Sequence, residues 1–306
     1  RLSVAGHDLR RAAAAARARI GYMSQRFALY ANLTVRQNLR FFARVYGLRG
    51  AAQRARVAWA LEALDLAPVA DTDSLHVIEA MLDNPSSGMD APAAFIIEPV
   101  QGEGGIHEVS GDYLRRAREL CDKHNALLFF DEVQCGNGRT GKYFGFEHHN
   151  VKPDMIATAK GLGGGFPIGA VMANEKAAQA LDYGDHGTPY GGNPLACAAS
   201  LAAVRTILDE DLMTQATEKG AYLVKQVKEK TAGTDYIKEI RGKGLMIGIE
   251  LNFPGKPVVM DMLDHHVISN VTMDTTIRLV PPLVITYEQI DRFVDVFVKV
   301  LEKQDR

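Results

Sequence analysis

The chain has 306 residues, of which 47% are hydrophobic and 24% charged, and its formal net charge at pH 7 is −2. These values are typical of a soluble globular protein with one large α/β domain plus an appendage, or with two domains. No run of about eighteen apolar residues occurs, so the sequence predicts no membrane span. The three cysteines are widely spaced and the histidine pairs are adjacent, which favours reduced thiols in a cytoplasmic protein without a metal site.

The charge is unevenly distributed along the chain. Residues 1–75 contain twelve arginines, no lysine and five acidic residues, a balance of +7, whereas residues 76–306 have a balance of −9. A basic segment can bind nucleic acid or an anionic membrane. The absence of lysine favours another interpretation, in which two segments with different codon usage have been joined. We therefore expect no nucleic-acid partner, and we expect residues 1–75 to pack poorly on the rest.

The first segment predicts two helices, because apolar residues recur at helical spacing over residues 41–46 and 57–64. The stretch Gly21–Leu39 resembles the Q-loop region of ABC-transporter ATPases, with Gln25 at the position of that family's glutamine. No Gly-x-x-x-x-Gly-Lys-Ser/Thr phosphate loop occurs in the sequence. The segment is therefore expected to be an ABC-ATPase-like fragment that does not bind ATP.

Strands and helices are expected to alternate from residue 92 onward. The expected strands are Ala93–Glu98, Ala126–Asp131, Met155–Ala159 and Ile168–Ala173, and the expected helices are Gly111–His124 and Asn193 to about Leu208. Strands separated by single helical crossovers predict an α/β fold with a mostly parallel sheet and flanking helices.

The last third of the chain predicts a small C-terminal α+β domain. Its expected elements are an amphipathic helix at Leu212–Lys230, strands at Gly244–Leu251, Val267–Asn270 and Thr276–Val280, and a final helix from Tyr287. The expected domains are thus residues 1–75, 76–211 and 212–306.

Two residues at the ends of expected strands could carry chemistry. Asp131 ends one apolar run, and Lys160 follows another and is itself followed by glycines. A lysine in such a setting can react covalently with a carbonyl compound, and a nearby carboxylate can hold a pyridine nitrogen protonated. The alternative is that Asp131 is structural and Lys160 is an ordinary surface lysine.

The sequence around these residues resembles that of the class-III aminotransferases, which use pyridoxal 5′-phosphate. Five segments match in family order, over about two hundred residues: Glu98–Gly105, Asp131–Gly141, Lys160–Gly169, His186–Ala196 and Arg278–Leu283. The resemblance is to the acetylornithine and ornithine aminotransferase branch. It implies a partial fold-type I large domain, a cytoplasmic homodimer, an amino donor of the acetylornithine or ornithine type, and a 2-oxo acid as acceptor.

The resemblance also implies a role for each matching residue. Lys160 would bond covalently to the cofactor and carry the proton during catalysis, and Asp131 would pair with the pyridine nitrogen. The residues that follow Asp131 would contact the cofactor: Glu132, Val133, which packs on the ring, and Gln134, which bonds its phenolic oxygen. Thr188 would serve both cofactor and substrate, Arg278 would bind the substrate carboxylate, and Glu103 would pair with Arg278 when a diamine occupies the site.

Two departures from the family pattern bear on activity. Pro189 stands where the family has a second hydroxyl residue that reaches the cofactor phosphate across the dimer. The family's Gly-Thr-Glu-Ala-type phosphate loop is also absent from this sequence. We expect an aminotransferase with impaired catalysis, and the alternatives are a coupling module related to ABC ATPases or a non-catalytic fusion of two remnants.

Overall fold

The computed structural model describes residues 34–45, 47–63, 74–180, 182 and 184–304, together with the strand residues Ser3–Val4 (β1) and His7–Asp8 (β2). The Q-loop-like stretch around Gln25 lies outside these residues. The chain forms two compact units, Arg1–Asn84 and Pro85–Arg306. None of the helices in the described ranges combines the length and the apolar character needed to cross a membrane.

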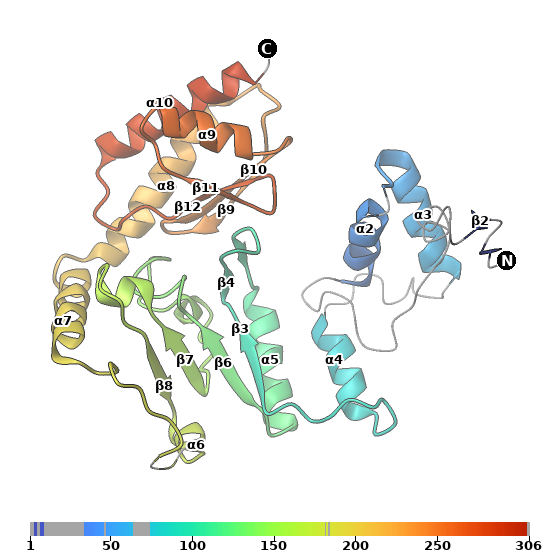
Figure 1. Cartoon of the computed structure of the whole chain (residues 1–306), viewed down its shortest axis with the longest axis vertical. Helices are drawn as coiled ribbons and strands as arrows, with labels where there is room; N and C mark the ends of the chain where they lie inside the picture. The colour runs from blue at the N-terminus through green and yellow to red at the C-terminus, as the bar shows by residue number, and fades with distance from the viewer. Residues whose placement is uncertain are drawn as a thin grey trace. The chain divides into compact units, whose positions relative to one another are not determined.

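The first unit contains helices α2 (Val35–Val45), α3 (Gly50–Ala63) and α4 (Ser74–Asp83) (Figure 1). The first two cover the segments in which the apolar spacing predicts helices. The two helices pack against each other. Val57 and Leu61 of α3 are buried against Val35, Leu39 and Ala43 of α2.

The second unit begins with a four-stranded sheet in the order β3-β6-β7-β8 (Figure 1). Its strands are β3 (Ala94–Ile97), β6 (Leu127–Asp131), β7 (Met155–Thr158) and β8 (Ala170–Ala173). The pairs β3–β6 and β6–β7 are parallel, and β8 runs antiparallel to β7. The prediction of an α/β fold with a mostly parallel sheet is confirmed, and each strand begins and ends within two residues of its expected bounds.

Helix α5 (Gly111–Lys123) forms the crossover between β3 and β6. Ser110 caps its first turn by accepting a hydrogen bond from the Tyr113 N–H at 3.2 Å, an arrangement that favours helix initiation. One apolar stripe of this helix, which includes Leu114 and Leu120, is buried. A short hairpin of β4 (Val100–Gln101) and β5 (His107–Glu108) precedes it.

Helices α6 (Glu175–Ala178), α7 (Pro194–Asp209) and α8 (Leu212–Lys230) lead into a second, antiparallel sheet with the order β11-β12-β10-β9. The strands and the remaining helices of this part are β9 (Ile237–Lys243), β10 (Met246–Leu251), α9 (Lys256–Asp264), β11 (Asn270–Thr272), β12 (Thr276–Leu279) and α10 (Tyr287–Lys303).

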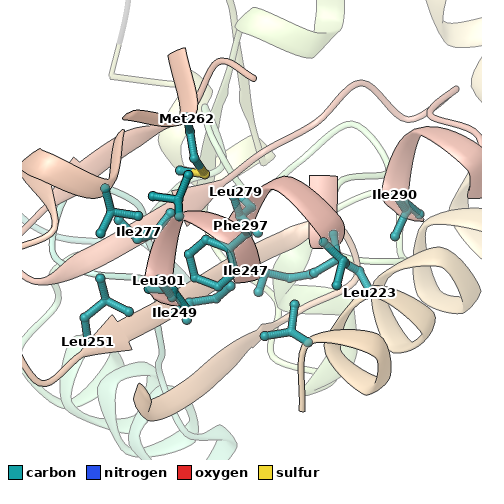
Figure 2. Packing of buried hydrophobic residues seen from close by; sticks show 14 residues of the cluster. Leu223, Ile247, Ile249, Leu251, Met262, Ile277, Leu279, Ile290, Phe297 and Leu301 are labelled. Carbon is teal, nitrogen blue, oxygen red and sulfur yellow. The ribbon is translucent and has the colours of Figure 1, made fainter. Parts of the chain in front are cut away.

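The core of this C-terminal part lies between the antiparallel sheet and its helices (Figure 2). Phe297 of α10 is fully buried. It belongs to one hydrophobic cluster with Ile249 and Ile277 of the sheet and Met262 of α9. Burying an aromatic side chain of this size stabilises the fold by roughly 1.5–3 kcal/mol. The position of this core explains why α8 and α10 each carry one apolar stripe.

One expected strand is wrong. Residues 267–269 form a loop, and only Asn270 of the expected strand Val267–Asn270 belongs to β11. His266 has a left-handed backbone (φ 60°), and Ile268 is 88% exposed. Val267 packs on the C-terminal core, but residues 267–269 follow a turn that ends α9 and pair with no described strand.

Candidate active site

Asp131 and Lys160 lie at the same edge of the parallel sheet. Asp131 is the last residue of β6 and is paired with Ala157 of β7. The Glu132 N–H continues the pairing with a hydrogen bond to the Ala157 carbonyl at 2.9 Å. Lys160 follows Ala157 by three residues, and parallel strands place their carboxyl ends at one edge, where α/β proteins bind ligands.

One of the two oxygens of the Asp131 carboxylate has a hydrogen-bond partner. Its Oδ1 accepts a hydrogen bond from the Val133 N–H at 3.0 Å. Within the described ranges no group donates to its Oδ2. Val133 itself is half-buried beside it. This geometry holds the carboxylate in place and leaves one oxygen for a cationic partner such as a protonated ring nitrogen.

Lys160 opens a short 3-10 turn, Lys160–Gly163, and its side chain is exposed. Its backbone is left-handed (φ 47°), a conformation that is unusual for a residue with a side chain and that is concentrated at functional sites. Its Nζ forms no ion pair or hydrogen bond with the residues that the structure describes. The amine is therefore accessible to a carbonyl compound.

The side chain of Glu132 is not available at this edge. It is fully buried, and its carboxylate accepts hydrogen bonds from the Gly145 N–H at 2.8 Å and the Phe146 N–H at 2.9 Å. The Cys135 thiol lies 3.1 Å from the same group. Burial raises the pKa of Glu132, although these hydrogen bonds oppose the shift. Since both oxygens are occupied by the protein, Glu132 braces the loop that follows β6.

Arg278, on β12, contacts one residue from the turn between β4 and β5 and one residue from the loop after β6. Its Nη1 forms an ion pair with Glu103 and lies 3.3 Å from Gln134 Oε1, and its Nε donates to Asn270 Oδ1 at 3.1 Å. The side chain of Arg278 is 13% exposed, whereas that of Glu103 is 71% exposed. The guanidinium is thus held in position, while the carboxylate that neutralises it faces solvent.

Gln134 lies directly over Gly102. A Cβ at Gly102 would lie 2.4 Å from the Gln134 amide, so a larger residue there would require this side chain to move. The structure brings Gln134 to Arg278 and does not give it a bond to Asp131 or Lys160. Thr188 is exposed in the segment that precedes α7, and no described residue at the sheet edge bonds to it.

Two residues that the sequence analysis did not single out connect these groups. Asn137 is buried and donates to Thr158 Oγ1 at 2.8 Å and to the Ala159 carbonyl at 3.1 Å, immediately before Lys160. Arg139 donates to the carbonyl of Pro281, just beyond Arg278. Burial lowers the pKa of Arg139 to about 10. Both residues lie inside the Asp131–Gly141 motif, but no spacing rule in the sequence shows which of its side chains reach other elements.

Known proteins resemble this chain in sequence and in fold. The chain is 52% identical over 206 residues to the acetylornithine aminotransferase of Methanocaldococcus jannaschii, covering 67% of this chain and 52% of that protein. A solved ornithine delta-aminotransferase of Plasmodium falciparum is 38% identical with a TM-score of 0.69, over 76% of this chain and 58% of that one. An ornithine aminotransferase of Toxoplasma gondii, solved with partial occupancy of PLP at its active site, is 36% identical with a TM-score of 0.69, over 76% of this chain and 55% of that one.

The chain spans about half the length of the curated relatives it matches. A sequence model of the family described as aminotransferase class-III matches residues 57–301. This range includes the sheet edge with Asp131 and Lys160 and the strand that carries Arg278. The chain therefore belongs to the class-III aminotransferase family.

Proposed function

We propose that this chain carries the lysine-bearing part of a pyridoxal-phosphate-dependent aminotransferase, which transfers the amino group of an acetylornithine- or ornithine-type donor to 2-oxoglutarate. The observation that carries the proposal is the arrangement of Asp131 and Lys160 at neighbouring parallel strand ends, with Arg278 held against the same loop through Gln134. The names of the relatives support the type of amino donor.

The residues present fit the ring and aldehyde ends of pyridoxal phosphate. Asp131 has one carboxylate oxygen without a described donor, as a partner for the ring nitrogen requires. Lys160 has an exposed amine without an ion pair to the described residues, as covalent attachment to an aldehyde requires. When bound, the cofactor supplies a protonated ring that withdraws electrons from the substrate carbon.

Fewer residues of this chain could bind the phosphate group of the cofactor. Thr188 offers an exposed hydroxyl, but Pro189 has neither a hydroxyl nor a backbone N–H. Each hydrogen bond to a charged group contributes about 1.5–3 kcal/mol, so the lack of the family's phosphate loop would weaken cofactor binding by many orders of magnitude. We therefore propose weak cofactor retention and impaired turnover when this chain acts alone.

The chain's own residues divide the catalytic work. Lys160 Nζ takes the proton from the substrate carbon that bears the amino group and returns a proton later in the cycle. Arg278 binds the substrate carboxylate through its guanidinium. Glu103 neutralises Arg278 when a donor without a carboxylate at that position is bound, and its exposure allows it to leave when a 2-oxo acid enters.

The proposal also covers the assembly and the first segment. We propose a cytoplasmic homodimer, which is typical of the class-III family. Residues 1–75 lack lysine and fall in a separate compact unit, which supports their origin as a joined ABC-ATPase-like fragment. A non-catalytic fusion of remnants is the competing possibility, and the experiment below distinguishes it.

Covalent attachment and turnover test the proposal. The full chain is incubated with pyridoxal phosphate, reduced with borohydride and digested, and the Lys160 peptide is analysed by mass spectrometry. Attachment at Lys160 that is lost in Lys160→Ala, with slow transamination of acetylornithine, is the expected result. Absence of attachment at saturating cofactor would support the remnant, and fast turnover would show that the chain is not impaired.

Glu103→Gln tests the role of the Arg278 ion pair. The variant removes the competing charge, so the affinity for a 2-oxo dicarboxylate should rise. Because Glu103 is largely exposed, the pair contributes about 0.2–1 kcal/mol, which corresponds to a gain of up to about fivefold. Calorimetric titration with 2-oxoglutarate measures this change. A weaker affinity in the variant would contradict competition by Glu103.

A further inference from the structure

The loop Cys135–Gly141, which we name the bridging loop, bonds both to the segment that leads into Lys160 and to the segment that follows Arg278. On one side Asn137 bonds to the end of β7. On the other side Arg139 bonds to the segment after β12. The loop starts four residues after Asp131, so a single segment connects all three groups assigned to the proposed site.

Asn137 holds the backbone just before Lys160 and lies close to the backbone just after it. Its Nδ2 donates to Thr158 Oγ1 at 2.8 Å and to the Ala159 carbonyl at 3.1 Å. On the far side of the lysine, a Cβ at Gly161 would lie 3.1 Å from the Asn137 Cβ. Asn137 is 3% exposed and has a left-handed backbone (φ 55°), which asparagine tolerates better than most residues.

Arg139 fixes the segment that follows Arg278. Its Nη1 donates to the carbonyl of Pro281 and, at 3.3 Å, to the carbonyl of Leu245 in the turn between β9 and β10. The Leu245 N–H donates back to the Arg139 carbonyl at 3.0 Å. No carboxylate in the described part of the chain pairs with Arg139. A guanidinium that is held only by backbone carbonyls acts on the position of those carbonyls.

We propose that Asn137 and Arg139 are positioning residues that act separately, Asn137 on Lys160 and Arg139 on Arg278. The proposal rests on the proposed function for the meaning of the two targets, but not for the contacts themselves. Because each side chain holds a different element, removing one should disturb one reactive group and leave the other. A merely structural loop residue would disturb both together.

Two substitutions separate the two effects. Asn137→Gly removes the amide without straining the left-handed backbone, since glycine adopts this conformation freely. Arg139→Met removes the donors and keeps much of the apolar side chain, and Arg139→Lys restores the charge and one donor. Arg205→Met removes an exposed arginine from α7 and serves as the matched control.

The first readout is the rate of borohydride-trapped attachment of pyridoxal phosphate at Lys160. The second is the affinity for glutarate, an unreactive dicarboxylate, measured by calorimetry, with Arg278→Met defining binding at Arg278. Asn137→Gly should slow attachment about tenfold and leave glutarate affinity within about twofold. Arg139→Met should weaken glutarate about tenfold and leave attachment within about twofold, and Arg139→Lys should recover part of the loss.

The proposal is supported if Asn137→Gly slows only attachment and Arg139→Met weakens only glutarate binding. It is overturned if one of these variants loses both activities equally, or loses neither. Hydrogen exchange keeps the test independent of the chemistry. If the wild-type chain neither attaches cofactor nor binds glutarate, the proposed function fails. The inference then stands if Asn137→Gly speeds exchange only over residues 161–164 and Arg139→Met only over residues 278–284, and it falls if both variants speed both segments.

Discussion

Replacing Asp154 by asparagine would remove the charge that fixes the start of β7, the strand that leads to Lys160. Asp154 is buried and accepts three hydrogen bonds through its carboxylate. Its Oδ2 accepts from Arg118 Nη1 at 2.7 Å and from the Leu128 N–H at 2.8 Å, and its Oδ1 accepts from Asn174 Nδ2 at 2.7 Å. The residue therefore ties β7 to α5, β6 and the cap of α6.

The expected loss of stability follows from these contacts. Breaking one partner of a buried, hydrogen-bonded ion pair costs about 3–5 kcal/mol. Asparagine keeps the shape and can still accept two of the bonds, so we expect about 3 kcal/mol, at the lower end. For a unit of this size that corresponds to a fall in Tm of about 6–12 °C. Asp122→Asn is the matched control, because Asp122 pairs with the same Arg118 but is largely exposed, and it should cost less than about 1 kcal/mol.

The pH dependence gives a second check on Asp154. Desolvation by itself would raise the pKa of Asp154, but the hydrogen bonds from Leu128, Arg118 and Asn174 outweigh it and lower the pKa below its ordinary value. The unfolded chain therefore binds the proton first as the pH falls through about 4. The contribution is present above that pH and is lost as the pH falls through the folded pKa. The difference between wild type and Asp154→Asn should shrink accordingly.

Unfolding should be followed by circular dichroism or hydrogen exchange over β6 and β7. The single tryptophan, Trp59, lies in the N-terminal unit, so its fluorescence does not report on this part of the chain. A loss below about 1 kcal/mol for Asp154→Asn, or a difference that stays constant in acid, would refute the assignment of a charged, buried anchor.

Two further predictions concern packing and pH. Gly220→Ala should lower stability by about 1–3 kcal/mol, because its Cβ would lie 2.0 Å from the Gly244 carbonyl oxygen, although alanine normally favours a helix; a raised Tm would contradict this contact. Burial lowers the pKa of His148, so the unfolded chain gains a proton first as the pH falls below about 6.5, and stability should decline with falling pH until the folded chain is protonated as well. His148→Gln should reduce that decline in chemical-denaturation measurements, and an unchanged slope would show that His148 does not contribute to it.

The sequence by itself determined most of the local elements and the family, but it did not predict β9 or α9. The apolar runs before Asp131 and Lys160 predicted strands that the structure contains, and the helix Leu212–Lys230 begins and ends at the expected residues. Such elements are predictable because each must bury its own apolar face. The spacing of apolar residues along the element shows where that face lies. The ordered motifs likewise identified the class-III aminotransferases, and the family match over residues 57–301 confirms it.

Only the tertiary structure decided how polar side chains from distant segments meet. Glu103 and Arg278 are 175 residues apart in the sequence, and Arg139 reaches a carbonyl 142 residues away. Glu132 follows Asp131 directly, yet its side chain is buried and accepts hydrogen bonds from backbone amides. These outcomes depend on how two sheets pack, because the direction and length of each polar side chain matter only once that packing has set the distances between backbones.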